Sequence, residues 1–186
     1  RRAHRSLPRL DAQSTAIVYQ DVPSNAQDWH RLFVALSHCS KPVITGTFRK
    51  VSFSIMRELL LACRTSERDL AAKPLAIFDA CPSPPLKWSD LTTQSVIDAA
   101  HAGIPSEFVS MPLAGATGPI TLIGSITQHC AETLAGVVIG QLAHPGCPVI
   151  WGGSPAVFDM KYGTTPMSAI ETMMIDSAYA LIGKRF

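Results

Sequence analysis

Chemically useful side chains gather just after the five segments that the sequence predicts as strands. Asp79 ends the third of these segments, Trp151 ends the fifth, and Asp159 follows soon afterwards. Small residues fill the fourth and fifth loops, namely Gly115, Ala116, Thr117, Gly152 and Gly153. Because Gly and Ala place little between a ligand and the backbone, these loops leave room for a bulky group. We therefore expect a ligand site at the carboxyl ends of the strands.

An aromatic cage for a cation is one interpretation of this region. The indole of Trp151 could present its π face to a quaternary ammonium group, with Tyr19 and Tyr162 completing the cage. Alternatively, Trp151 fills the mouth of a barrel and Tyr19 points toward a helix. Asp79 is either the charge partner of a ligand or the cap of the following turn.

Groups for acid–base or nucleophilic catalysis are scarce. Only Asp21, Asp79 and Asp159 stand near predicted strand ends, and Cys81 has no suitably placed His to activate it. We assign no catalytic residue. The five cysteines form no CxxC or Cys/His pair, so we expect no disulfide framework and no metal site, and we predict a reducing, cytoplasmic location.

The elements that position these residues alternate between strand and helix. Strands are predicted at residues 15–19, 42–47, 75–79, 107–111 and 148–151. Their apolar character without polar alternation favours a parallel sheet buried on both faces. Helices are predicted after each strand, the first capped by Ser24 or Asn25 with Trp29, Leu32, Phe33 and Leu36 on one face.

The other helices follow the same start and stop signals. One covers residues 51–63, with Phe53, Met56, Leu59, Leu60 and Cys63 inward. Ser89 opens the next, which Gly103 closes, and the last two are predicted at residues 121–143 and 167–182.

Strict alternation predicts βαβ crossovers, and hence a doubly wound sheet or a (β/α) barrel. No Gly-rich phosphate motif follows any strand, and the loop chemistry favours the barrel. A barrel has eight strands and takes about 250 residues. We therefore interpret residues 1–186 as part of a TIM barrel with about five strand–helix units, internal to a longer chain. We expect such a piece to expose an apolar edge.

Composition narrows the function classes. The 186 residues are 47% hydrophobic and carry 16 Lys plus Arg against 14 Asp plus Glu. Four of the basic residues are Arg1, Arg2, Arg5 and Arg9, so no basic stripe runs through the body and nucleic-acid binding is not expected. Gln128, His129 and Glu132 interrupt the most apolar segment, so we expect no membrane span.

Six segments together resemble one known family over nearly the whole chain. They are residues 41–46 (KPVITG), 81–89 (CPSPPLKWS), 111–119 (MPLAGATGP), 131–136 (AETLAG), 152–155 (GGSP) and 159–163 (DMKYG). In order and spacing they resemble the trimethylamine methyltransferase family, including its glycine betaine-type members.

The resemblance implies a TIM-barrel enzyme that moves a methyl group from a methylated amine, trimethylamine or a quaternary amine such as glycine betaine, to the Co(I) of a corrinoid protein. The corrinoid would be carried by that partner, with no cofactor bound directly. We expect the amine site to include Asp79, Gly115, Ala116, Thr117, Trp151, Gly152, Gly153, Asp159 and Tyr162. Homo-oligomerisation stays open, as does pyrrolysine, whose position in trimethylamine enzymes aligns beyond Phe186.

Two other functions are compatible with the sequence. One is a non-catalytic barrel segment that binds an amine or a protein partner without turnover. The other is a lyase or aldolase of the same fold, which is less favoured because Lys50 and Lys161 both lie in predicted loops rather than at strand ends.

Overall fold

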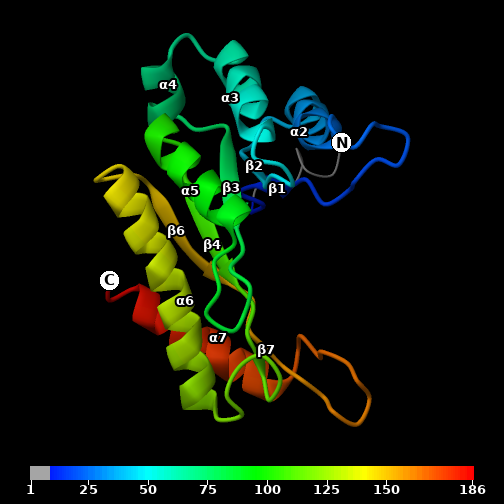
Figure 1. Cartoon of the computed structure of the whole chain (residues 1–186), viewed down its shortest axis with the longest axis vertical. Coiled ribbons are helices and arrows are strands. Elements are labelled where there is room, and N and C mark those ends of the chain that lie inside the picture. Colours follow the sequence, from blue (N-terminus) through cyan, green and yellow to red (C-terminus); the bar gives the residue numbers. More distant parts are fainter. Residues whose placement is uncertain (1–8) are drawn as a thin grey trace.

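The computed structural model describes residues 9–186. The chain folds around a five-stranded parallel sheet (Figure 1). In spatial order the strands are β1 (Gln13–Ser14), β2 (Val43–Thr45), β3 (Ala76–Ala80), β4 (Ser106–Ser110) and β6 (Val149–Gly153). The predicted α/β class with a parallel sheet is confirmed. Arg1, Arg2 and Arg5 lie outside the described residues.

The order of the strands in the sheet distinguishes the two predicted topologies. Along the chain, each new strand of this sheet is added beside the previous one, and always on the same side. A doubly wound sheet reverses at a switch point, whereas a barrel adds strands in sequence order. In the part of the chain described, β1 and β6 do not pair with each other, so the sheet is open. The architecture is consistent with part of a (β/α) barrel.

The helices lie between and after these strands (Figure 1). They are α2 (Gln27–His38), α3 (Ser52–Ala62), α4 (Glu67–Ala72), α5 (Asp90–Ala102), α6 (Leu122–Ala143) and α7 (Ile170–Gly183). Two short strands, β5 (Leu113–Ala114) and β7 (Ala156–Val157), form a second parallel pair just beyond β4 and β6. α4, β5 and β7 were not predicted from the sequence.

Helix ends follow the predicted capping chemistry in the second half of the chain. The Ser89 hydroxyl accepts from the backbone N–H of Thr92, and the Thr121 hydroxyl accepts from that of Gly124. Gly103 ends α5 at φ 65°, a left-handed conformation that favours glycine. These local signals explain why the bounds of α5 and α6 could be predicted closely.

The first half of the chain departs from prediction in three places. β1 covers residues 13–14 instead of 15–19 and pairs with Val43 and Ile44 of the short β2. The Thr15 N–H makes one more bond, to the Ile44 carbonyl. Ala26, not Ser24 or Asn25, precedes α2 and makes no side-chain cap. Phe33 is 53% exposed, because the buried stripe of α2 is rotated to include Asp28 and Arg31.

Two other helices differ in detail from their predictions. Cys63, predicted inward, follows the end of α3 and is exposed. The last helix begins at Ile170 rather than near residue 167, because a turn involving Pro166 and Ala169 precedes it.

The core lies between the sheet and the helices. Its larger cluster joins Leu32 of α2, Met56 and Leu60 of α3 to Val43 and Phe78 of the sheet. A smaller cluster surrounds Ala80, Val96 and Phe108. Helices therefore cover one face of the strands; in a closed barrel the opposite face would be the inner face.

Helix α6 is long and apolar enough to cross a membrane by length and composition, with a mean hydropathy of 1.2 over its most apolar window. Its buried positions include His129, Glu132 and Thr133, and it packs against β4, β6 and α5. These contacts place it in the helical layer on one face of the sheet.

Exposed apolar side chains are abundant on the last two helices. On α6 they include Ile123, Val138 and Leu142, and on α7 they include Ile170, Met173, Met174 and Leu181. The expected apolar exposure is therefore present on helix surfaces, beside an open sheet. That the chain is internal to a longer one stays a prediction.

A pair of leucine truncations tests the placement of the core. Leu60 is fully buried in the larger cluster, whereas Leu142 on α6 is 80% exposed. We expect Leu60→Ala to lower the free energy of unfolding by about 2–5 kcal/mol because it opens a cavity. The matched Leu142→Ala should change it by less than about 0.5 kcal/mol. Urea denaturation of both variants measures this, and equal losses would contradict the assigned core.

Candidate functional site

Two carboxylates lie side by side on the open face of the sheet. Side chains of β3 and β4 alternate, so Phe78 and Phe108 are buried under the helices while Asp79 and Glu107 face the other way. Asp79 and Glu107 are Cα partners in the parallel register. The fold therefore forms an acid pair from Asp79, near the carboxyl end of β3, and Glu107, near the amino end of β4.

Burial and proximity raise the pKa values of both acids. The pKa of Asp79 is raised by desolvation, and the Arg31 guanidinium partly opposes that rise. The pKa of Glu107 is also raised, first by desolvation and then by the negative charge of Asp79. Two half-buried carboxylates that repel each other form a wall on which a cation would be stabilised.

One oxygen of the acid pair has no partner. Asp79 Oδ1 is buried and receives no hydrogen bond in the structure. An unsatisfied buried carboxylate oxygen costs free energy, so such groups commonly mark a place for a ligand or water.

Glycines on the neighbouring strands make room for the acid pair. A Cβ on Gly46 would overlap Asp79 Oδ1, and one on Gly152 would come within 2.9 Å of Glu107 Cγ. Gly152 was predicted as a site residue because small residues leave space. The structure shows that this space is occupied by the side chain of Glu107.

A small cavity of about 220 Å³ adjoins Asp79 at the carboxyl ends of β1, β2 and β3. Its lining combines hydroxyl, thiol and aromatic groups with the two charged side chains, namely Ser14, Thr15, Arg31, Gly46, Thr47, Phe48, Asp79, Cys81, Thr92 and Ser95. The volume is below the range typical of drug-sized ligand pockets, so it fits a ligand of only a few heavy atoms.

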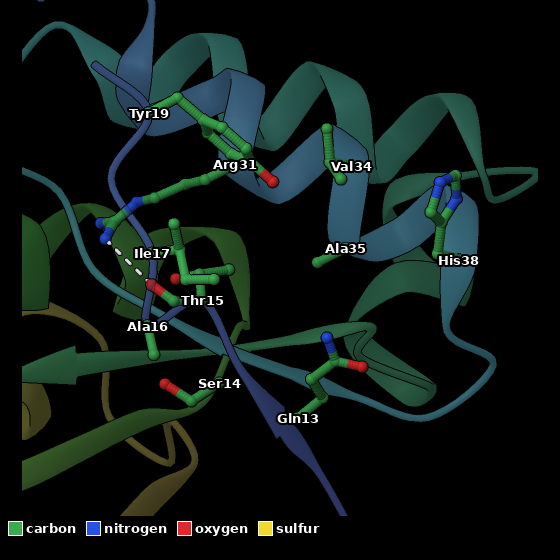
Figure 2. A pocket seen from close by; sticks show the side chains of 10 residues that line it. All are labelled: Gln13, Ser14, Thr15, Ala16, Ile17, Tyr19, Arg31, Val34, Ala35 and His38. Atoms are coloured by element: carbon green, nitrogen blue, oxygen red, sulfur yellow. Dashed lines mark hydrogen bonds between the residues drawn. The ribbon is translucent and has the colours of Figure 1, made fainter. Parts of the chain in front are cut away.

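Arg31 of α2 forms the cationic border of this cavity and of a second one of about 200 Å³ beside β1 (Figure 2). It donates to the carbonyl oxygens of Thr15 and Gly46 and lies 4.5 Å from the centroid of the Phe48 ring. The buried Asp28 carboxylate lies 3.7 Å away and accepts from the Phe48 N–H. Arg31 thereby ties α2 to the ends of β1 and β2.

Cys81 is not poised as a nucleophile. Its pKa is raised to about 11 by burial, by Asp79 and by Glu107, so the thiol is protonated at neutral pH. The sequence likewise has no His placed to activate this thiol.

The predicted residues of the fourth loop lie apart from the acid pair's cavity. Gly115 adopts φ 86° and helps to line a separate cavity of about 420 Å³. The Thr117 hydroxyl accepts from the Leu113 N–H at 3.0 Å, and the Thr117 carbonyl accepts from Gln128 of α6. Ala116 closes the same turn through its N–H to the Leu113 carbonyl.

Asp159 lines the same 420 Å³ cavity as Gly115. Its Oδ1 accepts from the backbone N–H groups of Lys161 and Tyr162, at 2.9 and 3.1 Å, so it caps a tight turn. The Tyr162 ring is exposed and lies beside the Lys161 ammonium. The structure therefore groups Asp159 with Gly115 but not with Asp79.

Trp151 lies on the helix-covered face of the sheet, because its register partner is the buried Phe108. Its ring stacks on Tyr179 of α7 with centroids 4.8 Å apart, and Tyr179 stacks on the buried His129 at 3.6 Å. Gly153 leaves the space that His129 occupies. Tyr19 packs edge-on against His30 of α2, so the structure does not bring Tyr19, Trp151 and Tyr162 together as a cage.

Sequence reasoning missed Glu107 and Arg31 as members of the site. Glu107 was placed in a strand, but its side could be known only from its register with Asp79. Arg31 lies in a predicted helix, where an arginine normally faces solvent. A usable signal was the i, i+3 spacing of Asp28 and Arg31, which allows an ion pair on one helix face.

Comparison with known proteins shows extensive similarity to one family. A family model described as trimethylamine methyltransferase matches residues 2–186. The chain is 30% identical to a trimethylamine methyltransferase of Desulfitobacterium hafniense over 181 residues, which are 97% of this chain and 36% of that protein. It is 36% identical to one of Methanosarcina thermophila over 182 residues, covering 94% of this chain and 37% of that protein.

A glycine betaine methyltransferase of Desulfitobacterium hafniense is also similar. It is 26% identical over 165 residues, which are 89% of this chain and 34% of that protein. The chain thus spans about a third of the length of the curated relatives it matches.

Alkylation of Cys81 tests the electrostatics of the acid pair. Because the Asp79 charge helps to raise the pKa of the thiol, we expect Asp79→Asn to lower that pKa. At pH 9 the variant should therefore react faster with iodoacetamide at Cys81, as followed by peptide mass spectrometry. The control is Asp90→Asn, whose side chain is 85% exposed in an ion pair with Lys50. Equal rates in the two variants would show that Asp79 does not act on Cys81.

Proposed function

The chain belongs to the trimethylamine methyltransferase family, and from this premise we propose that it carries the amine-binding wall of an enzyme that transfers a methyl group from a methylated amine to the Co(I) of a corrinoid protein. The family assignment supports a methyltransferase. The corrinoid partner and the identity of the amine belong to the proposal.

The acid pair is the observation that carries this proposal. A methylated ammonium group is a compact cation without strong hydrogen-bond directionality, so charge and shape must recognise it. Asp79 and Glu107 offer two carboxylates on one face, and Asp79 Oδ1 has no other partner. A cation there would relieve the repulsion between the carboxylates that raises the pKa of Glu107.

The reaction asks little acid–base chemistry of the protein. The corrinoid, carried by the partner, supplies the nucleophile that takes the methyl group, and the electrons of the broken C–N bond remain on the amine nitrogen. The part left to this chain is to hold the ammonium group with one methyl accessible. Two features fit that division. The Cys81 thiol is protonated, and among the described residues no activated nucleophile lies beside it.

Neutralising either acid tests the proposed amine site. We expect Asp79→Asn and Glu107→Gln each to raise KM for trimethylamine or glycine betaine about tenfold, equivalent to about 1.4 kcal/mol. The exposed Glu58→Gln on α3 is the control and should leave KM unchanged. The assay follows methylation of the corrinoid protein in its Co(I) state.

Three results of that assay would contradict the proposal in different ways. Unchanged KM in both acid variants would remove the acid pair from the site. No transfer from any methylated amine would remove the enzymatic function. Amine binding without transfer would favour a non-catalytic amine-binding protein.

The pH dependence of cation binding gives a second test. Because both acids have raised pKa values, they take up protons as pH falls from neutral into the acid range. We expect the affinity for tetramethylammonium, measured by calorimetry, to fall across this range. The Asp79→Asn/Glu107→Gln double variant should bind weakly at every pH, and an equally steep pH dependence in that variant would exclude the acid pair as its cause.

A further inference from the structure

We propose that a row of polar side chains on α6, made of Ser125, Gln128 and Glu132 and here called the polar row, positions the loops that follow β3 and β4. Its consequence for turnover rests on the proposed function. Its structural part, the fixing of the loops, stands on the hydrogen bonds described below.

Glu132 is the centre of the polar row. Its side chain is 1% exposed, yet both carboxylate oxygens are used. Oε1 accepts from the Leu86 N–H at 2.8 Å and from Gln128 Nε2 at 3.0 Å, and Oε2 accepts from the Ser110 hydroxyl. One carboxylate thus joins the loop after β3, the carboxyl end of β4 and the next polar side chain on its own helix.

The bond to Leu86 holds an unusual backbone conformation. Leu86 has φ 55°, in the left-handed region that residues other than glycine rarely adopt. Its side chain is 64% exposed, so packing of that side chain does not account for the conformation. A sparsely populated conformation persists where the surroundings determine it. Here two backbone bonds between Ser83 and Lys87 close the turn, and the Glu132 carboxylate accepts from the Leu86 N–H within it. The backbone carbonyl of Glu132 also accepts from Trp88 Nε1 in the same loop.

The rest of the polar row holds the loop after β4. Gln128 Nε2 donates to the Thr117 carbonyl at 2.8 Å, and the Ser125 hydroxyl donates to the Pro119 carbonyl at 2.7 Å. Thr117 in turn fixes the start of β5 through its hydroxyl and the Leu113 N–H. Two inward positions of one helix, Ser125 and Gln128, therefore secure the loop after β4, which includes Gly115 beside the larger cavity.

A buried carboxylate is a costly way to gain stability alone. An ion or acid taken from water loses its hydration, and apolar side chains of similar volume often pack at no loss of stability. What a carboxylate adds is direction, because several donors must converge on its oxygens. The loop after β3 begins at Cys81, which lines the cavity beside Asp79, so the polar row is tied through Leu86 to the loop that starts at that cavity.

Two glutamines on α6 allow a matched test. Gln128→Ala removes the bonds to Thr117 and Glu132. Gln141→Ala on the same helix removes bonds to the Cys147 carbonyl and the Gly146 N–H, near the carboxyl end of α6. Each variant loses hydrogen bonds made by a glutamine side chain. We therefore compare their melting temperatures, so that a general loss of stability can be separated from a local effect on the loop.

The first readout does not depend on activity. Hydrogen exchange of each variant, made in the full-length protein, is measured by mass spectrometry. We expect Gln128→Ala to speed exchange in residues 113–119 and Gln141→Ala to speed it only in residues 144–147. Equal exchange of residues 113–119 in the two variants would overturn the proposal, even if the natural protein transferred no methyl group.

Methyl transfer supplies the functional readout. The amine still meets an intact acid pair in Gln128→Ala, so we expect kcat to fall about tenfold because the loop after β4 is misplaced at the carboxyl end of the sheet, with little change in KM. Gln141→Ala should leave both constants unchanged. A rise in KM with constant kcat, or equal kcat values in the two variants, would refute positioning.

Variants of Glu132 separate its shape from its charge. Glu132→Ala leaves the Leu86 N–H and Ser110 hydroxyl without their acceptor, and we expect a larger loss of kcat than in Gln128→Ala. Glu132→Gln keeps one acceptor oxygen for Leu86, and the Ser110 hydroxyl can turn to accept from the new amide, so kcat should recover in part. If Glu132→Ala and Glu132→Gln were equally impaired while the Gln128→Ala and Gln141→Ala pair did not differ, the polar row would have no positioning role.

Discussion

Burial of Phe78 and Phe108 under the helices determines which residues of β3 and β4 face the other way. Side chains of a strand alternate, so a shift of one residue would bury Asp79 and Glu107 under the helices and expose the two phenylalanines. Apolar burial of the phenylalanines is therefore what places two acids together on the inner face. The candidate site therefore depends on how the opposite face of the sheet packs against the helices.

The same alternation explains why Trp151 serves the core rather than a ligand. Its register partner is Phe108, so its ring points toward α7 and stacks on Tyr179. The sequence could not show this, because the fifth predicted strand is apolar on both faces and its parity is set only by pairing with β4. Glu107 was missed for the converse reason: its role appears only once the register with Asp79 is known.

Local signals allowed much of the fold to be predicted, and non-local ones account for the differences. Ser89, Thr121 and Gly103 mark helix ends through bonds within a few residues, and those ends were placed closely. The buried face of α2 was predicted wrongly, because Asp28 and Arg31 turn inward. There they bond to backbone groups of Phe48, Gly46 and Thr15. The β5–β7 pair depends on contact between segments about forty residues apart, which no local pattern indicates.

Asp79 and Glu132 show two opposite states of a buried carboxylate, and the difference separates binding from support. Every oxygen of Glu132 accepts hydrogen bonds from the protein, so its negative charge is already compensated by dipoles and adds rigidity. Asp79 keeps a buried oxygen without a donor and faces a second acid, so its charge is compensated only in part, by Arg31. The proposed cation site needs an acid of the second kind, whereas an acid of the first kind supports the loops after β3 and β4.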